Sequence, residues 1–212
     1  MKYGIVILFC LIKVFGCRES YVASFIPFGF LFVLLYTWRN KDKKEKMFQK
    51  IDIIYTLMIA AVCIGTFTLK QENIVIIAIF TLIQAFDEEI MFRYFLLQGS
   101  THKIRDMILN SILFSLMHLV MFINIPIGAL YVSYGQVLIS EFTLRFLMGM
   151  AFCMIYFRNK SVMEVTFFHF LNNITITIWN QGMTLFYVCL MVYLLVGYRK
   201  KILDSIKHLQ EK

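Results

Sequence analysis

The amino-acid sequence predicts an all-α fold, a polytopic bundle of about eight transmembrane helices with both termini in the cytoplasm. Of the 212 residues, 60% are hydrophobic and 16% are charged, whereas soluble domains carry about 25% charged residues. Only two prolines and ten glycines interrupt the chain, which favours continuous helices. Four runs lack Asp, Glu, Lys and Arg and approach or exceed the about 20 residues of a spanning helix: Ser20–Trp38, Ile53–Leu69, Met107–Ser140 and Val165–Tyr198.

The first four predicted spans are separated by charged residues. The first span is short and contains Lys13, and the second and third lie on either side of a basic connector from Arg39 to Lys50. Lys70 separates the third span from the fourth. In chain order these spans are Tyr3–Gly16, Ser20–Trp38, Ile51–Leu69 and Ile74–Gly99.

The last four predicted spans come mainly from the two longest uncharged runs. About 34 residues at 1.5 Å each would exceed the roughly 30 Å hydrocarbon core, so neither run can be one helix. Asn124-Ile125-Pro126 and Asn180-Gln181-Gly182 supply the breaks. These spans are Met107–Ile123, Gly135–Phe157, Ser161–Trp179 and Met183–Tyr198. Because no repeat or low-complexity linker divides the chain, we expect a single integral membrane domain over residues 1–212.

The distribution of basic residues predicts the orientation. With eight spans and both ends inside, sixteen of the 21 lysines and arginines fall on the cytoplasmic side, including those of the Arg39–Lys50 connector and the C-terminal tail. Only Arg18 and Lys70 fall outside, and this is the asymmetry that membrane insertion favours. The net charge of +8 therefore reflects topology in the cell membrane. It does not indicate a nucleic-acid partner, which needs a basic face on a soluble domain.

Polar residues inside three of the predicted spans suggest a shared site. The fourth span contains Asp87-Glu88-Glu89 and Arg93, the fifth contains His118, and the seventh contains His169 and Asn173. A charge at a helix centre costs roughly 2.5–3.5 kcal/mol on insertion scales, so such residues are functional candidates. In the predicted topology Glu88 and His118 each lie 11 residues from the cytoplasmic end of their span, about 16 Å deep. His169 and Asn173 bracket this depth at about 12 and 18 Å.

The local spacing separates the roles of the two glutamates. Glu89 and Arg93 are four residues apart and can form an ion pair on one helix face. Glu88 points about 100° away from Glu89 and can face another helix. The residues suit hydrolysis of a peptide bond: Glu88 can take a proton from water held with His118, and His169 and Asn173 can donate to the oxyanion. Phe114, four residues before His118, can form a wall of the site.

These motifs resemble the CAAX protease and bacteriocin-processing (CPBP/Abi) family of intramembrane glutamate proteases, related to type II CAAX prenyl endopeptidases. The family pattern EExxxR, FxxxH and HxxxN occurs here as Glu88-Glu89-x-x-x-Arg93, Phe114-x-x-x-His118 and His169-x-x-x-Asn173. The resemblance implies a protease core of about residues 74–180, with Glu88, His118, His169 and Asn173 catalytic. It also implies Glu89 and Arg93 as supporting residues, and catalysis without a metal or cofactor.

Other interpretations of the same residues remain open. Glu88, His118 and His169 are acceptable zinc ligands, although local ligand spacing is absent. The Glu89–Arg93 pair can be purely structural, and buried acids and histidines also form the proton relays of transporters. Glu141 and Arg145, four apart in the sixth span, are expected to neutralise each other, and binding of a substrate carboxylate by Arg145 is the alternative.

The sequence thus predicts a multi-pass endopeptidase of the cell membrane that cleaves a peptide or a membrane protein. Bacteriocin self-immunity, or maturation of a signal or bacteriocin peptide, fits a small member of such a family. A non-catalytic immunity or partner-binding membrane protein with the same polar core is the alternative. The sequence contains neither HExxH nor GxGD nor G-x-S-x-G, which argues against the other common intramembrane protease mechanisms. Its substrate, oligomeric state and use of prenylated substrates are not determined by these patterns.

Overall fold

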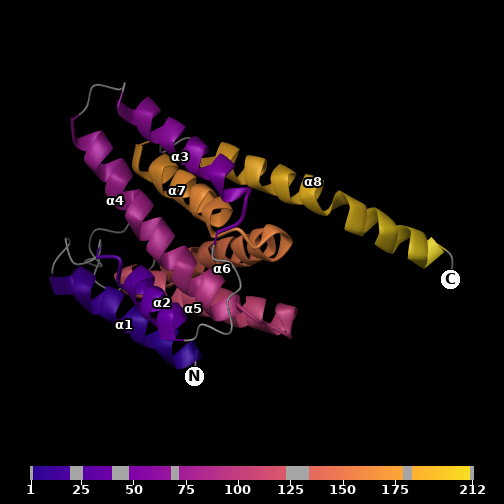
Figure 1. Ribbon diagram of the computed structural model, residues 1–212, viewed down its shortest axis with the longest axis horizontal. Coiled ribbons are helices and arrows are strands. Elements are labelled where there is room, and N and C mark those ends of the chain that lie inside the picture. Colours follow the sequence, from indigo (N-terminus) through magenta and orange to yellow (C-terminus); the bar gives the residue numbers. More distant parts are fainter. Residues whose placement is uncertain are drawn as a thin grey trace.

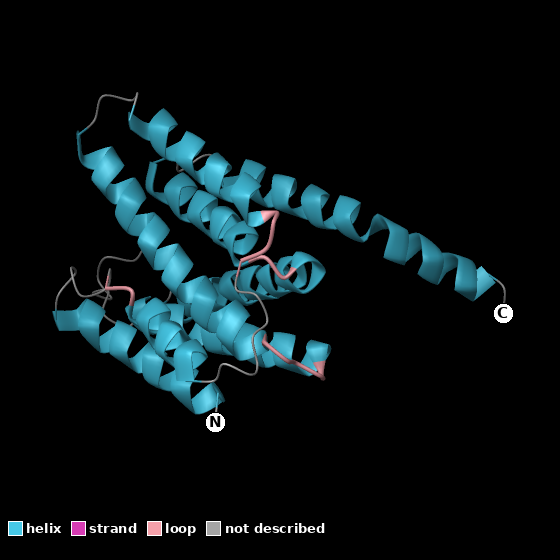
Figure 2. Cartoon of the chain, viewed as in Figure 1, coloured by secondary structure: helices cyan, strands magenta, loops and turns pink. Residues whose placement is uncertain are grey.

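The computed structural model describes the backbone at residues 2–19, 26–39, 48–67, 72–122, 134–178 and 183–210, and its regular elements there are all helices (Figures 1 and 2). Each predicted span corresponds to one helix, except the fourth, which contains α4 and η3, so the all-α prediction is confirmed for this part of the chain. The predicted breaks at 124–126 and 180–182 lie outside the described residues, as do residues 40–47 of the basic connector. The helices are α1 (Lys2–Glu19), α2 (Phe28–Arg39), α3 (Asp52–Phe67), α4 (Glu72–Glu89), η3 (Ile90–Phe95), α5 (Lys103–Phe122), α6 (Tyr134–Asn159), α7 (Val162–Ile178) and α8 (Met183–Gln210).

The helix lengths test only part of the membrane prediction. Among the described residues, α6 provides one stretch, Gly135–Asn159, that is long and apolar enough to cross a membrane, with a mean hydropathy of 1.6. Shorter apolar stretches lie in α2, α3 and α8, at Phe28–Thr37, Asp52–Ile64 and Phe186–Arg199. The number of crossings and the side on which the termini lie therefore remain predictions.

Two helices differ from their predicted bounds for identifiable reasons. Helix α8 continues to Gln210, well past the predicted end at Tyr198, and its C-terminal part extends away from the other helices (Figure 1). The predicted span ends just before Arg199, the first charged residue, but lysine and arginine are good helix formers in water. Helix α2 begins at Phe28, just after Pro27, whereas the predicted span begins at Ser20. Proline cannot donate a backbone hydrogen bond and is favoured where a helix begins.

The fourth span is not one regular α-helix. Its α-helical part ends at Glu89 and continues without a break as the π-helical segment η3, all of whose residues are buried. The backbone N–H of Leu96 donates to the carbonyl of Met91, five residues earlier, which is the π pattern. Short π segments inside α-helices are found frequently at functional sites.

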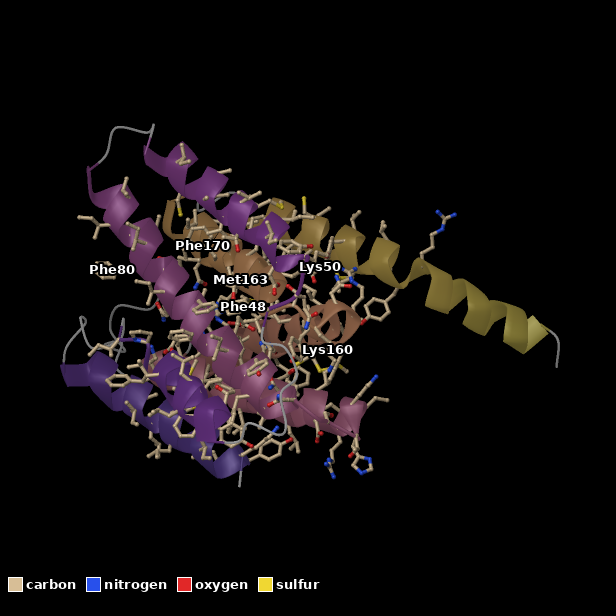
Figure 3. The ribbon with its side chains drawn as sticks, in the orientation of Figure 1. Phe48, Lys50, Phe80, Lys160, Met163 and Phe170 are labelled. Carbon is tan, nitrogen blue, oxygen red and sulfur yellow. The ribbon has the colours of Figure 1, made fainter. Side chains whose placement is uncertain are left out.

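Helix α4 lies in the middle of the fold, with α1 and α2 on one side and α3 and α7 on the other (Figure 1). Helices α5 and α6 pack directly against each other. A Cβ atom on Gly149 of α6 would lie 3.0 Å from the Cα of Ser111 on α5, so glycine allows this close approach. Figure 3 shows one aromatic side chain at the surface of the bundle and one in its interior: Phe80 on α4 points outward and is 37% exposed, whereas Phe170 on α7 is fully buried.

The turn between α6 and α7 is held by a buried carboxylate. Oε1 of Glu164 accepts hydrogen bonds from Tyr55 on α3 at 3.0 Å and from Arg158 at the end of α6 at 2.7 Å. Oε2 accepts from Asn159 at 2.8 Å. Lys160 in this turn has a φ of 55°, a conformation that is uncommon for residues other than glycine. The cluster fixes the start of α7, about two helical turns before His169.

Candidate active site

Glu88 lies in the last turn of α4 and faces two histidines from two other helices. Its Oε2 is 3.6 Å from Nε2 of His118 on α5 and 3.9 Å from Nε2 of His169 on α7. The side chains are nearly inaccessible, with Glu88 1% exposed, His118 9% and His169 0%. The predicted meeting of these three residues is therefore confirmed, although they are far apart in the sequence.

Glu89 holds the second histidine from the opposite ring edge. Its Oε1 is 2.7 Å from Nδ1 of His169, and its Oε2 is 3.0 Å from Nε of Arg93. Because a carboxylate only accepts, Nδ1 of His169 donates this hydrogen bond and Nε2 faces Glu88. The predicted Glu89–Arg93 pair is confirmed, whereas the contact between Glu89 and His169 was not predicted. Arg93, Glu89 and His169 form a chain of three buried polar groups that ends at the site.

The protonation of His118 follows from its backbone contact. Its Nδ1 lies 2.9 Å from the carbonyl oxygen of Phe114, and a carbonyl only accepts, so Nδ1 carries the proton. In the neutral ring, Nε2 is therefore a hydrogen-bond acceptor directed at Glu88. The Phe114 ring packs 4.4 Å from the His118 ring and 5.7 Å from the His169 ring. Phe114 thus forms the wall that the sequence predicted.

Two buried polar atoms at the meeting point of Glu88 and the histidines are left without a hydrogen-bond partner in the part of the chain that the structure describes. Oε2 of Glu88 and Nε2 of His169 are buried and have no hydrogen-bond partner among the described residues. Distances of 3.6 and 3.9 Å are too long for direct hydrogen bonds, but a water lying to one side of the three atoms can bond to them. Buried polar groups are rarely left unpaired, so these atoms indicate the position of a ligand. The other oxygen of Glu88, Oε1, accepts a 3.3 Å hydrogen bond from Gln84 one turn earlier.

The same three residues have a geometry that can also hold a metal ion. One ligand atom from each of Glu88, His118 and His169 lies within 4.8 Å of the other two. In a tetrahedral site with bond lengths near 2.0 Å, ligand atoms lie about 3.3 Å apart. The zinc interpretation therefore passes a geometric test and has to be separated by experiment.

Asn110 on α5 is a fully buried residue of the site that was not predicted from the sequence. Its Oδ1 accepts from Nη1 of Arg93, and its Nδ2 donates to the carbonyl of Phe92 in η3. Asn110 therefore ties the π segment to the guanidinium that holds Glu89. It lies eight residues before His118, about two helical turns, and hence on the same face of α5. That spacing is the signal that could have identified it.

Asn173 follows His169 by one turn of α7 and is partly exposed. Its Oδ1 accepts a 3.2 Å hydrogen bond from Asn172, which is nearly fully buried and accepts in turn from Tyr187 at 3.3 Å. The Glu141–Arg145 pair also forms, with Oε2 of Glu141 and Nε of Arg145 3.6 Å apart. The expectation that these two charges neutralise each other is confirmed.

The comparison with family models matches half of the chain. The model described as type II CAAX prenyl endopeptidase Rce1-like covers residues 70–175. This range includes α4 and η3 with Glu88, Glu89 and Arg93, α5 with His118, and α7 as far as Asn173. No curated protein and no solved structure matches the chain.

Proposed function

The chain belongs to the type II CAAX prenyl endopeptidase Rce1-like family, and on this premise we propose that it is an intramembrane endopeptidase that works without a metal. The proposed catalytic residues are Glu88, His118, His169 and Asn173. The observation that carries the proposal is the buried carboxylate of Glu88, 3.6 and 3.9 Å from two imidazoles that are held by separate partners. Such an arrangement binds a water and leaves one base free to take its proton.

In the first step, a water donates one hydrogen bond to Oε2 of Glu88 and one to Nε2 of His118. Both atoms are acceptors when Glu88 is ionised, because the proton of His118 is on Nδ1. The water oxygen then attacks the carbonyl carbon of the scissile peptide bond while Glu88 takes the departing proton. The side chain of Phe114 keeps bulk water away from the site, which strengthens the electrostatic interactions there.

In the second step, the tetrahedral intermediate collapses. His169 in its protonated form donates from Nε2 to the oxyanion, and the Glu89 carboxylate on Nδ1 stabilises the positive ring. The Asn173 amide is the second proposed donor. The carbon–nitrogen bond breaks, Glu88 returns its proton to the leaving amine, and the products are a new carboxyl group and a new amine.

The substrate class follows from the setting of the site. We propose that the chain spans the cell membrane several times and cleaves a peptide or membrane protein within or next to the bilayer, in peptide maturation or bacteriocin self-immunity. The family description names CAAX prenyl endopeptidases, so a prenylated C-terminal peptide is the first substrate to test. A non-catalytic immunity or partner-binding role would leave the buried Glu88 unused.

The proposal is tested with the full chain in lipid vesicles and a quenched fluorescent peptide that ends in a farnesylated CAAX sequence. An unprenylated copy tests whether the lipid is required. We expect hydrolysis that is abolished by Glu88→Gln, because an amide of nearly equal shape cannot take a proton from water. Glu141→Gln, which changes a glutamate of another helix, is the matched control and should remain active. Full activity in Glu88→Gln at normal folding would refute Glu88 as the base.

A zinc hydrolase is the second candidate, because the three ligand atoms lie within 4.8 Å of one another. A zinc enzyme would lose its activated water on chelation, since the metal lowers the pKa of that water towards about 7. We expect the purified protein to carry no stoichiometric metal and to stay active after prolonged chelation. One zinc per chain by elemental analysis, with activity restored only by zinc, would make His118 and His169 ligands instead.

A further inference from the structure

A second buried ion pair lies directly beside the proposed base. Nζ of Lys13 on α1 is 2.8 Å from Oδ2 of Asp87 on α4, and the two side chains are 3% and 0% exposed. Asp87 immediately precedes Glu88. The family match covers residues 70–175, so Lys13 lies outside the matched part of the chain. Removing one partner of such a buried pair strongly destabilises the folded protein, because the other charge is left buried and unpaired.

The other oxygen of Asp87 holds the beginning of α2. Oδ1 accepts a 2.8 Å hydrogen bond from the backbone N–H of Phe30, in the first turn of that helix. The first N–H groups of a helix lack intrahelical partners, and a carboxylate at this end stabilises them. The capping group here comes from α4, so Asp87 is fixed by α1 through one oxygen and by α2 through the other.

Gly29 brings α2 into direct contact with the same turn. A Cβ atom at Gly29 would lie 2.9 Å from both the backbone oxygen and Oδ1 of Asp87, and would overlap the side chain of Met91. Lys13 also donates from Nζ to the carbonyl of Ile26, just before α2, at 3.2 Å. The contact from α1 therefore falls on residue 87, and those from α2 fall on residues 87 and 91, one position before and two positions after the two glutamates of the site.

We propose that Lys13 and Asp87 are positioning residues for Glu88, and that α1 and α2 therefore belong to the catalytic unit. This inference rests on the proposed function. Neighbouring side chains on a helix point about 100° apart, so fixing Asp87 towards α1 and α2 directs Glu88 towards α5 and α7. Because Oε2 of Glu88 must bond to a water shared with His118, a small rotation of this turn would displace the base from that water.

The test measures turnover per folded molecule with the farnesylated peptide, with folding followed by size exclusion and thermal unfolding. Lys13→Met removes the cation at nearly constant length, and Lys13→Arg keeps it. Lys103→Met, at an exposed lysine of α5, is the matched control. Gly29→Ala lifts α2 from Asp87 without changing any charge, and Gly4→Ala, which has open space around its added Cβ, is its control.

We expect Lys13→Met and Gly29→Ala to lower kcat about 10- to 100-fold with KM unchanged, since a displacement of about 1 Å can have this effect. Lys13→Arg and both controls should stay near the wild type. If Lys13→Met does not fold, the kcat of Gly29→Ala alone tests the positioning role. Unchanged kcat per folded molecule, or a change in KM only, would overturn the positioning role and leave the peptidase intact. An inactive wild type would overturn the proposed function, and the positioning role with it.

Discussion

Replacing Glu89 by glutamine should damage folding and catalysis separately, because Glu89 links a buried cation to a catalytic imidazole. Its two oxygens lie 2.7 Å from Nδ1 of His169 and 3.0 Å from Nε of Arg93, and both Glu89 and Arg93 are fully buried. The variant leaves the Arg93 guanidinium without its carboxylate. Removing one partner of a buried pair costs about 3–5 kcal/mol, so we expect a loss of stability of this size.

The double variant Glu89→Gln/Arg93→Met separates the two effects. It removes the orphaned cation as well, and neutral replacement of a buried pair is often close to neutral, so most of the stability should return. Turnover should not return, because His169 still lacks the carboxylate that orients and charges its ring. The assays are reversible unfolding in detergent and kcat per folded molecule. A single variant within about 1 kcal/mol of the wild type, or a double variant no more stable than the single one, would refute the reasoning.

Four further predictions concern separate parts of the chain. His169→Ala and Asn173→Ala should each lower kcat more than they change KM, since removing an oxyanion donor costs about 2.7–4 kcal/mol of barrier; equal loss through KM would contradict this role. Gly149→Ala should destabilise the fold by about 1–3 kcal/mol through overpacking against Ser111, whereas Gly135→Ala on the same helix, with open space around its Cβ, should be neutral or stabilising in the same unfolding assay. Cysteines placed in the Arg39–Lys50 connector should resist labelling from outside intact cells; strong labelling there would reverse the predicted orientation. Burial raises the pKa of Asp106, but hydrogen bonds from Ser100, Arg105 and Tyr3 outweigh it and hold this pKa below its usual range. The stability that Asp106 contributes is therefore present above its unfolded pKa of about 3.9 and lost as the pH falls through its lower folded value. In a profile of melting temperature against pH, Asp106→Asn should reduce the fall in melting temperature at acid pH. An unchanged fall at acid pH would contradict this role of Asp106.

The helices and the meeting of the three central residues could be predicted because both depend on local patterns. Runs without charge give the helices, and similar distances along three spans place Glu88, His118 and His169 at about one level. The i to i+4 spacing also gave the Glu89–Arg93 and Glu141–Arg145 pairs, both of which form.

The contacts that support the site could not be predicted because they depend on which helices are neighbours. Nothing in the sequence of α1 says that Lys13 faces Asp87, since the packing of α1 against the turn of α4 is a tertiary property. The contact of Glu89 with His169 needs the rotation of α7 about its axis, which hydropathy does not give. A π-helical segment has no strong sequence signal either, so the sequence predicts a regular helix beyond Glu89.

The segment from Ile90 to Phe95 has a consequence for how this protein tolerates changes in length. A π turn accommodates one residue more than the α-helical turn that it replaces, so deletion of a single residue there would give a more regular helix. The same deletion would place the arginine three residues after Glu89 instead of four, and would shift its guanidinium along the helix axis by about 1.5 Å relative to the carboxylate. Neighbouring side chains can repack around a substitution in this segment, but not around a deletion. Related chains should therefore keep the spacing between the glutamates and the arginine unchanged, while the side chains between them vary.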